Sequence, residues 1–294
     1  MSSLTHNPTS VSAMMRTVIY ALMPGIGVSL WVYGWGPLIN IAITVTGALV
    51  AETVVLMLRQ RPALPALGDY SATITALILA LVLPPLLPWW LPIIGIVFAI
   101  VVAKHLYGGL GYNPFNPAMA GYALLLIAFP DEMARWPEPL TPWGISLDFS
   151  ETLGTDLSTL SLEGRHAIIV NIAFLVGGLW LISKRIISWH IPVAMLASIT
   201  LLATIFWLWS PSLYPAPLTH LFGGATMLGA FFIATDPVTT CTTNRGRLWF
   251  GMGSGILFYM ISSFGGYPDA IAFAVLIMNM AAPTIDRYSA TPHA

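Results

Sequence analysis

Long apolar stretches, separated by short polar or Gly/Pro-rich turns, run along almost the whole chain. Crossing the hydrocarbon core of a bilayer takes about 20 residues of helix. Stretches of this character lie near residues 16–34, 37–58, 70–84, 89–107, 115–129, 166–184, 190–209, 219–235, 246–263 and 268–284. The pattern predicts an all-α polytopic membrane protein with about ten transmembrane helices. Several stretches are short, and those around Ser71, Asn116 and Ala225 begin at Gly/Pro-rich turns, which is typical of half-helices or re-entrant segments.

One polar segment, residues 130–165, interrupts this pattern and is expected to be an external acidic loop. It contains seven of the 12 acidic residues of the chain, namely Asp131, Glu132, Glu138, Asp148, Glu151, Asp156 and Glu163. It separates a first membrane repeat, 16–129, from a second, 166–284, and leaves residues 1–15 and 285–294 as cytoplasmic ends. Because each block holds an odd number of spans, the second block enters the membrane from the opposite side.

A sequence echo links the two blocks. Ser71-Ala72-Thr73 leading to Pro84 returns as Gly224-Ala225-Thr226 leading to Asp236-Pro237, and Gly111-Tyr112-Asn113-Pro114 returns as Gly266-Tyr267-Pro268. Between blocks of opposite orientation, such an echo predicts two inverted five-helix repeats. Matching breaks in two halves also indicate a binding site near the bilayer midplane. The alternative is that Gly/Pro-rich turns resemble one another by chance.

Composition and charge support the membrane assignment and suggest an orientation. Of 294 residues, 57% are hydrophobic and 8% charged, so lipid must be most of the solvent. A cytoplasmic N-terminus places most of the basic residues inside, as the positive-inside rule requires. These are Arg16, Arg59, Arg61, Lys104, Lys184, Arg185, Arg245, Arg247 and Arg287. The net charge of -1 gives no indication of nucleic-acid binding. The single cysteine excludes an internal disulfide or a Cys-ligated metal site within the chain.

Four acidic residues lie in or beside the apolar stretches. Glu52 is in the middle of a stretch, so it should face the bundle interior and needs a partner. Asp69 is expected to cap the third span, and Asp269 stands at a helix start, where the helix dipole favours a carboxylate. Asp236 precedes Pro237; it either binds an ion, a proton or a polar cofactor edge, or marks a helix boundary at the headgroups.

Two Asn-Pro steps, at Asn113 and Asn116, are the most concentrated group of polar and helix-breaking residues within the apolar stretches. They predict a rigid turn with amide donors and acceptors at membrane depth, suited to the edge of a flat heteroaromatic ring or to a polar solute. The alternative is a tight turn that satisfies its own hydrogen bonds. The histidines are scattered, and no residues form a hydrolytic constellation or a phosphate-binding loop, so no catalytic residue is assigned.

Four segments carry a resemblance to a known family: residues 61–72, 111–119, 227–238 and 243–247. They are similar to the D subunit of the Rnf-type ion-translocating electron transport complex, and the likeness runs from about residue 16 to the end. A weaker likeness extends to the B subunit of the sodium-pumping NADH:quinone reductase. The fold of that family resembles the urea transporters, with ten spans in two inverted halves of five, which agrees with the repeat inferred from the echo.

The resemblance implies a flavoprotein. Family members carry FMN joined by a phosphoester to a threonine of a Ser/Thr-x-Ala-Thr motif in the loop between spans five and six, and a non-covalent riboflavin is associated with the membrane part. This chain lacks the motif in that loop, so loss of the covalent site is expected. Thr155, Thr159 and Thr226 are the alternative attachment sites; Asn113, Asn116, Thr235 and Asp236 are expected near the non-covalent flavin or the ion path.

The resemblance also implies a function and partners. The chain would be a multi-pass inner-membrane subunit of a bacterial complex that couples electron transfer between ferredoxin and NAD(H) to Na+ or H+ translocation. Its partners would be subunits of the A, B, C, E and G types, together with the lipid bilayer. A channel or facilitator for a small polar solute, and a structural scaffold subunit, are the alternative functions.

Overall fold

The computed structural model describes residues 8–136, 162–267 and 269–289, and in this part the chain forms helices and no strand. The first half contains α1 (Pro8–Tyr33), α2 (Gly36–Leu58), α3 (Ala63–Leu67), α4 (Ser71–Val82), α5 (Trp90–Val97), the π-helix η2 (Phe98–His105), α6 (Pro117–Ala128) and α7 (Pro130–Met133). The second half contains α9 (Leu162–Ser183), α10 (His190–Trp209), α11 (Pro217–Phe222), α12 (Thr226–Leu228), the π-helix η4 (Gly229–Ile233), α13 (Asn244–Phe264) and α14 (Ile271–Ser289).

Every apolar stretch expected from the sequence coincides with helix, although some boundaries differ. α1 begins at Pro8 and α14 continues to Ser289, because a helix can extend past its apolar stretch into polar residues. The eighth stretch, 219–235, is not one continuous helix, in agreement with the half-helix expected to start near Ala225. It divides into α11, α12 and η4, and the chain turns at Gly223 and Gly224, where Gly224 has a φ of 51° that glycine adopts without strain.

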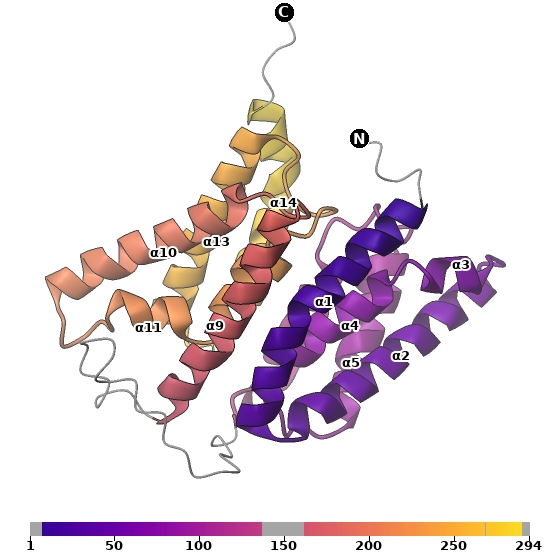
Figure 1. Cartoon of the computed structure of the whole chain (residues 1–294), viewed down its shortest axis with the longest axis horizontal. Helices are drawn as coiled ribbons and strands as arrows, with labels where there is room; N and C mark the ends of the chain where they lie inside the picture. The colour runs from indigo at the N-terminus through magenta and orange to yellow at the C-terminus, as the bar shows by residue number, and fades with distance from the viewer. Residues whose placement is uncertain (1–7, 137–161, 268, 290–294) are drawn as a thin grey trace, which may run out of the picture.

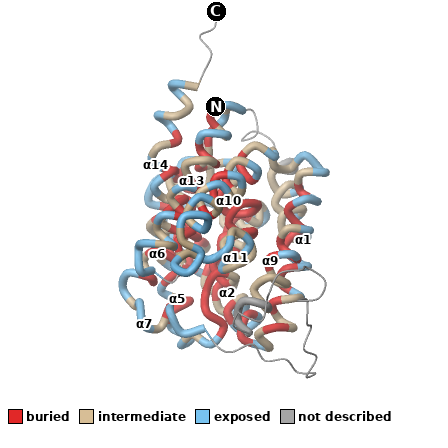
Figure 2. Tube along the Cα trace, turned by 90° about the vertical axis from the view of Figure 1, so that its left-hand side faces the viewer, coloured by how far each residue is buried: buried red, intermediate tan, exposed pale blue. Residues whose placement is uncertain are grey.

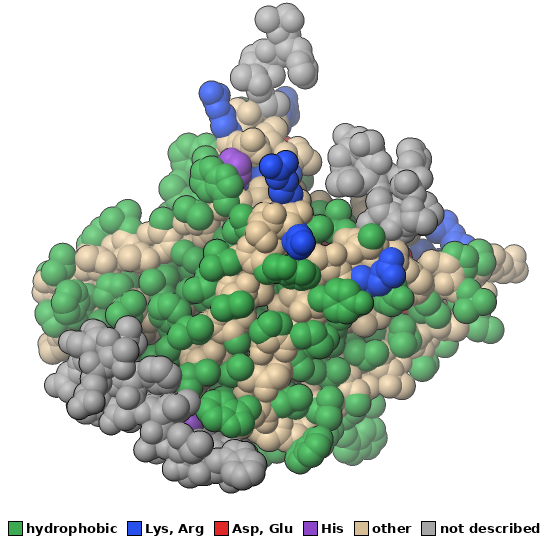
Figure 3. All heavy atoms as spheres, in the orientation of Figure 1, with side chains coloured by type: hydrophobic (Ala, Val, Ile, Leu, Met, Phe, Trp, Pro, Cys, Tyr) green, Lys and Arg blue, Asp and Glu red, His purple; other side chains and the backbone are tan. Residues whose placement is uncertain are grey.

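Apolar helices dominate the described part of the chain. Four of them are long and apolar enough to cross a membrane: Val11–Tyr33, Gly36–Leu58, His166–Ser183 and His190–Trp209. Ser71–Val82, Trp90–His105 and Pro117–Ala128 are shorter and equally apolar in character. Figure 3 shows a face covered mainly by hydrophobic side chains, with Lys and Arg gathered toward its upper part. A bilayer can accommodate such a surface, because helices satisfy their backbone hydrogen bonds internally.

The two halves lie side by side, and long helices from each meet between them. In Figure 1 the first half, in indigo and magenta, is on the right, and the second half, in orange and yellow, is on the left. α1 packs along α9, and α6 packs against α14. Gly177 of α9 lies against the Ala21 carbonyl of α1, so that the two backbones approach closely. Buried residues run through the middle of the molecule in Figure 2.

Candidate functional site

A cavity of about 90 Å³ lies between the two halves. On this scale a single water needs at least about 10–15 Å³, so the cavity has room for several waters or for one edge of a ring. Its walls are mostly apolar, with a few polar side chains: Ser71, Thr75, Lys104, Asn113 and Asn116 from the first half, and Thr235 and Asp236 from the second. Four of the residues singled out in the sequence, Asn113, Asn116, Thr235 and Asp236, therefore meet in one place.

Asn116 joins two helix ends at this cavity. It is the N-cap of α6, where its Oδ1 accepts a hydrogen bond of 3.2 Å from the backbone N–H of Met119. Its Nδ2 donates over 3.3 Å to the carbonyl of Ile233, the last residue of η4. Helix ends leave backbone donors and acceptors without partners inside the helix. Asn116 thus satisfies one such group on each half and holds the start of α6 beside the end of η4.

The side-chain oxygen of Asn113, another residue that lines the cavity, has no hydrogen-bond partner. Asn113 Nδ2 donates to the Phe115 carbonyl over 2.9 Å, but Asn113 Oδ1 is buried and has no such partner. A buried acceptor without a partner costs free energy, so it usually pairs with an ordered water or a ligand. The Asn-Pro turn therefore does not satisfy all of its own hydrogen bonds, and Asn113 offers an acceptor to a molecule in the cavity.

Thr235 and Asp236 form the opposite wall. The Thr235 hydroxyl donates to the Phe231 carbonyl within its own helical segment, at 2.6 Å. The Asp236 carboxylate accepts one hydrogen bond on each oxygen, from the Val238 N–H and the Thr239 hydroxyl, both at 3.1 Å. These bonds hold the loop that follows η4, and each carboxylate oxygen keeps acceptor capacity beyond them.

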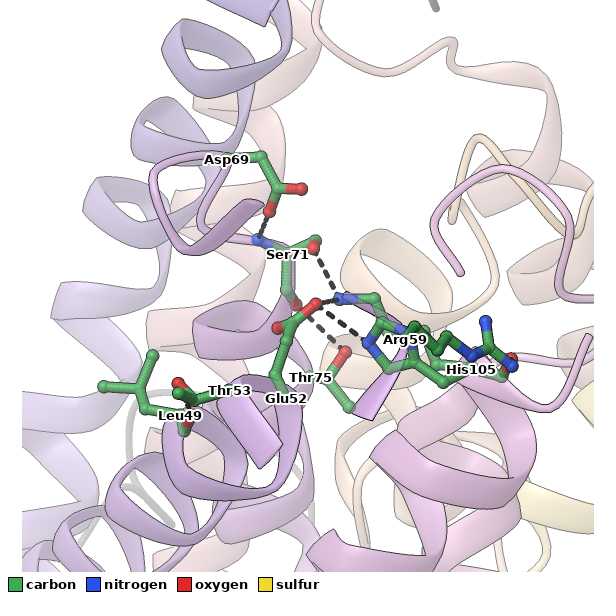
Figure 4. Close-up of polar contacts among 9 residues, drawn as sticks. Leu49, Glu52, Thr53, Arg59, Asp69, Ser71, Thr75 and His105 are labelled. Atoms are coloured by element: carbon green, nitrogen blue, oxygen red, sulfur yellow. Dashed lines mark hydrogen bonds and ion pairs between the residues drawn. The ribbon is translucent and has the colours of Figure 1, made fainter. Parts of the chain in front are cut away.

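A buried charged cluster stands beside the cavity, around Glu52 of α2 (Figure 4). Lys104 Nζ donates to Glu52 Oε1 over 2.6 Å, and His105 Nε2 lies 3.2 Å from the same oxygen. Lys104 also donates to the Ser71 hydroxyl over 2.8 Å. Glu52 and Lys104 are each only 2% exposed, and Glu52 Oε2 is without a partner. The expectation that Glu52 faces inward and requires a partner is confirmed.

The same cluster shows that Lys104 is not a surface residue. Lys104 on η2 points to Glu52 and Ser71, so its ammonium group is buried within the bundle, and the residue also lines the cavity. Lys104 and His105 were missed as site residues because their partner is more than 50 positions away in the sequence. The available signal was a lysine inside one apolar stretch together with a glutamate inside another, since two buried opposite charges tend to pair.

The remaining acidic residues act at helix starts. Asp69 Oδ1 accepts from the Ser71 N–H over 2.7 Å at the beginning of α4, as expected for a cap. Asp269 Oδ1 accepts from the Ile271 N–H over 3.0 Å at the beginning of α14. Within the described ranges, no group of three or more His, Cys, Asp or Glu residues could hold a metal ion.

Of the three threonines considered for FMN attachment, the structure describes one. Thr226 is completely buried at the start of α12, and its hydroxyl lies 2.8 Å from the His220 carbonyl and 2.9 Å from that of Gly223. It is not among the residues that line the cavity. Thr155 and Thr159 lie outside the described residues.

Comparison with known proteins gives a consistent set of relatives. The D subunit of the ion-translocating oxidoreductase complex of Escherichia fergusonii is 44% identical over 335 aligned positions, which cover 98% of this chain and 95% of the relative. The proteins of the same name from Escherichia coli O81 and Erwinia tasmaniensis are 44% and 43% identical, with the same coverage.

The alignment also contains gaps in this chain. Since 98% of 294 residues is about 288, about 47 of the 335 aligned positions hold a residue only in the Escherichia fergusonii protein. Residues 1–293 match the sequence profile of the NQR2, RnfD, RnfE family. With a match over nearly its whole length, the chain belongs to the NQR2, RnfD, RnfE family.

Proposed function

We propose that this chain is the membrane flavin-carrying subunit of a bacterial inner-membrane complex that couples electron transfer between ferredoxin and NAD(H) to Na+ or H+ translocation. Its family and the name of its relatives support the assignment to an ion-translocating oxidoreductase complex. In this proposal the chain is not catalytic alone: it works with subunits of the A, B, C, E and G types, and its N- and C-termini are cytoplasmic.

The cavity between the halves is the proposed site for a non-covalent flavin, either riboflavin or FMN. The observation that carries this proposal is the unpartnered Asn113 Oδ1 in a mostly apolar cavity. Ligand sites typically combine apolar walls with a few polar groups that fix orientation. A flavin ring edge presents an N–H and two carbonyls, which match in type the Asn113 acceptor and the Lys104 and Ser71 donors that line the same cavity. The residues present therefore fit the polar edge of such a ring.

A flavin bound here would supply the electron-transfer chemistry, while the protein supplies position and charge compensation. Uncompensated charge is costly in an environment of low dielectric constant. The Asp236 carboxylate and the Asn113 amide oxygen line the same cavity and can attract a cation. Lys104, neutralised by Glu52, adds a donor without leaving a net positive charge in the wall. We propose that these groups lie on the path of Na+ or H+.

We further propose that covalent FMN is absent. Thr226 is buried with its hydroxyl engaged by two carbonyls, which leaves no room for a phosphoester. The segment between residues 130 and 165 contains no Ser/Thr-x-Ala-Thr motif. Thr155 and Thr159 are the remaining attachment sites if FMN is covalent.

We also infer that the halves are inverted repeats of five spans, arranged as in the urea transporters. Corresponding helices start 154 residues apart: Gly36 and His190, Ala63 and Pro217, Trp90 and Asn244, Pro117 and Ile271. Side-chain contacts follow the same offset. Glu52 contacts His105 in the first half, and at the offset positions Phe206 lies with its ring 5.5 Å from that of Tyr259.

Visible spectra of the purified full-length chain, before and after denaturation, test the flavin assignment. We expect a band near 450 nm, the ordinary flavin absorbance, in the native protein. Because the flavin is proposed to be non-covalent, the denatured, gel-separated band should show weak or no flavin fluorescence. A bright band would refute the loss of the covalent site, and peptide mapping would then distinguish Thr155, Thr159 and Thr226. A colourless native protein would favour the solute channel or the scaffold.

A further inference from the structure

Asn279, in the middle of α14, contacts both walls of the cavity without lining it. Its Oδ1 accepts a hydrogen bond of 3.0 Å from the backbone N–H of Asn116, on the first half. Its Nδ2 donates over 3.1 Å to the carbonyl of Thr239, in the loop after η4 on the second half. The side chain is 2% exposed, and both ends of its amide are used. A single buried amide thus connects segments more than 100 residues apart in sequence.

The first of these bonds fixes Asn116, which itself connects α6 to η4. With its backbone held by Asn279, Asn116 can direct Oδ1 to the N–H of Met119 and Nδ2 to the carbonyl of Ile233. Loss of the Asn279 acceptor would leave the Asn116 N–H buried and unpartnered, which is unfavourable and favours a shift of the turn. Asn113, three residues earlier in the same turn, would move with it.

The second bond belongs to a row of contacts by which α14 holds the loop after η4. One turn further along, the Ala282 carbonyl lies 3.6 Å from the Cys241 thiol. One more turn on, Asp286 accepts from the Thr242 N–H at 2.8 Å and from its hydroxyl at 2.9 Å. Asn279 is the member of this row nearest the cavity, since Thr239 also donates to Asp236. α14 therefore supports the wall that carries Asp236.

We propose that Asn279 is a positioning residue that holds the two cavity walls at a fixed separation, and that flavin affinity depends on it. The part of this inference that concerns flavin rests on the function proposed above. The part that concerns the walls does not, because it follows from contacts within the chain. No side-chain atom of Asn279 lies among the cavity-lining groups, so its effect on a ligand passes through Asn116 and Thr239.

Amide hydrogen exchange of the full-length protein in detergent tests the positioning role without any ligand. In Asn279→Leu, which keeps the side-chain volume, exchange should become about tenfold faster in residues 114–120 and 236–243. Asn279→Ala, whose side chain is smaller and cannot clash, should give the same pattern of exchange. It replaces the leucine variant in this test if that variant does not fold. Asn40→Leu is the matched control: Asn40 is also buried and donates to a distant backbone carbonyl, that of Pro84, but neither Asn40 nor Pro84 lines the cavity.

Titration with riboflavin then tests the consequence for the ligand. For both Asn279 variants we expect the dissociation constant of riboflavin to rise about tenfold, because buried hydrogen bonds that hold the site are lost. For Asn40→Leu it should stay unchanged. Unchanged exchange in both segments, or equal acceleration in Asn40→Leu, overturns the positioning role. If the wild-type protein binds no riboflavin, the flavin proposal fails, and the exchange result still decides whether Asn279 holds the walls.

Discussion

Glu52 is held by two side chains from one π-helix, and this arrangement has an energetic cost. Moving charges out of water is expensive, and close pairing with an opposite charge only offsets that cost. Here Lys104 and His105 both approach the same carboxylate oxygen, while the other oxygen has no partner. The cluster is therefore better explained by a role beside the cavity than by a need for stability.

Removing the carboxylate should be more harmful than removing the whole pair. Glu52→Leu leaves the Lys104 ammonium buried and unpaired, for which we expect a loss of about 3–5 kcal/mol. The double variant Glu52→Leu/Lys104→Leu should recover most of that loss, because no unpaired charge remains. Thermal unfolding of the purified protein measures both.

Asp131 provides the control for that comparison. It is an exposed carboxylate in the first turn of α7, so Asp131→Leu should change stability by no more than about 1 kcal/mol. Equal unfolding temperatures for Glu52→Leu and Asp131→Leu would show that the Glu52–Lys104 pair is not buried in the protein.

The single cysteine offers a second prediction at this scale. Burial, with a further contribution from the Asp286 carboxylate, raises the pKa of the Cys241 thiol to about 12. The thiolate is the reactive form, and almost none is present at pH 7–8 when the pKa is so high. A fluorescent maleimide should therefore label native protein far more slowly than protein unfolded in SDS, and Asp286→Asn should speed native labelling. Rapid stoichiometric labelling of the native protein would contradict this prediction.

Residue chemistry in the cavity could be predicted in part. Asn113, Asn116 and Asp236 stood out because polar groups beside Pro are unusual at membrane depth. Asn279 did not, because an isolated asparagine in a helical stretch has no local signal, and its partner Asn116 is 163 positions away. Partners across the fold become visible only when the halves are packed.

Among the helices, the pairing of α10 with α13 depends on two glycines one turn apart. A Cβ at Gly255 would overlap the Ser198 hydroxyl and the Met195 carbonyl of α10. Gly251 lies in the same way against the Ile191 carbonyl. Small residues four positions apart let two membrane helices approach closely, and dispersion contacts then stabilise the pair.

Alanine at one of these glycines should separate the pair. Because the obstructing atoms at Gly255 include backbone, we expect Gly255→Ala to cost about 1–3 kcal/mol, as overpacking does. Gly27→Ala is the control, since a Cβ there meets nothing within 4 Å and a helical alanine is favoured over glycine. Thermal unfolding temperatures should therefore fall for Gly255→Ala and stay level or rise for Gly27→Ala. The reverse order would contradict the close approach of α10 and α13.

The positions of the helices could be predicted far better than their interruptions. Apolar length locates α2 and α10 almost to the residue, because a bilayer requires that length. The same criterion joined α11, α12 and η4 into one span, although Gly223 and Gly224 signalled a break. The π-helices η2 and η4 had no sequence signal, since their wider turns depend on what packs around them.

At the scale of the whole molecule, the halves share an order of helices but not their chemistry. The first half places Glu52 against Lys104 and His105, whereas the offset positions of the second hold Phe206, Phe258 and Tyr259. Phe206 also contacts Tyr214 and Phe264 there, with ring centroids 5.0 and 5.6 Å away. At these corresponding positions one half thus holds charged groups and the other aromatic rings, so the repeat preserves the arrangement of the helices and not the interactions between them.

Cysteine accessibility can test the proposed orientation of the two halves. In a Cys241→Ala background, an impermeant maleimide applied to intact cells should label Leu86→Cys and Leu213→Cys, which occupy exposed turns on the proposed outer side. Gln60→Cys and Lys184→Cys, exposed on the proposed inner side, should react only after the cells are opened. Labelling of Leu86→Cys without Leu213→Cys would rule out an inverted arrangement.

The contacts of Asn279 also order events during biosynthesis. The turn before α6 and the loop after η4 are joined by a side chain on α14, which follows both of them in the chain. Until that helix is inserted and packed, the two walls lack their common support. A ligand that requires both walls would therefore bind only after α14 has been made and packed against them, so the cavity is completed late in the assembly of these helices.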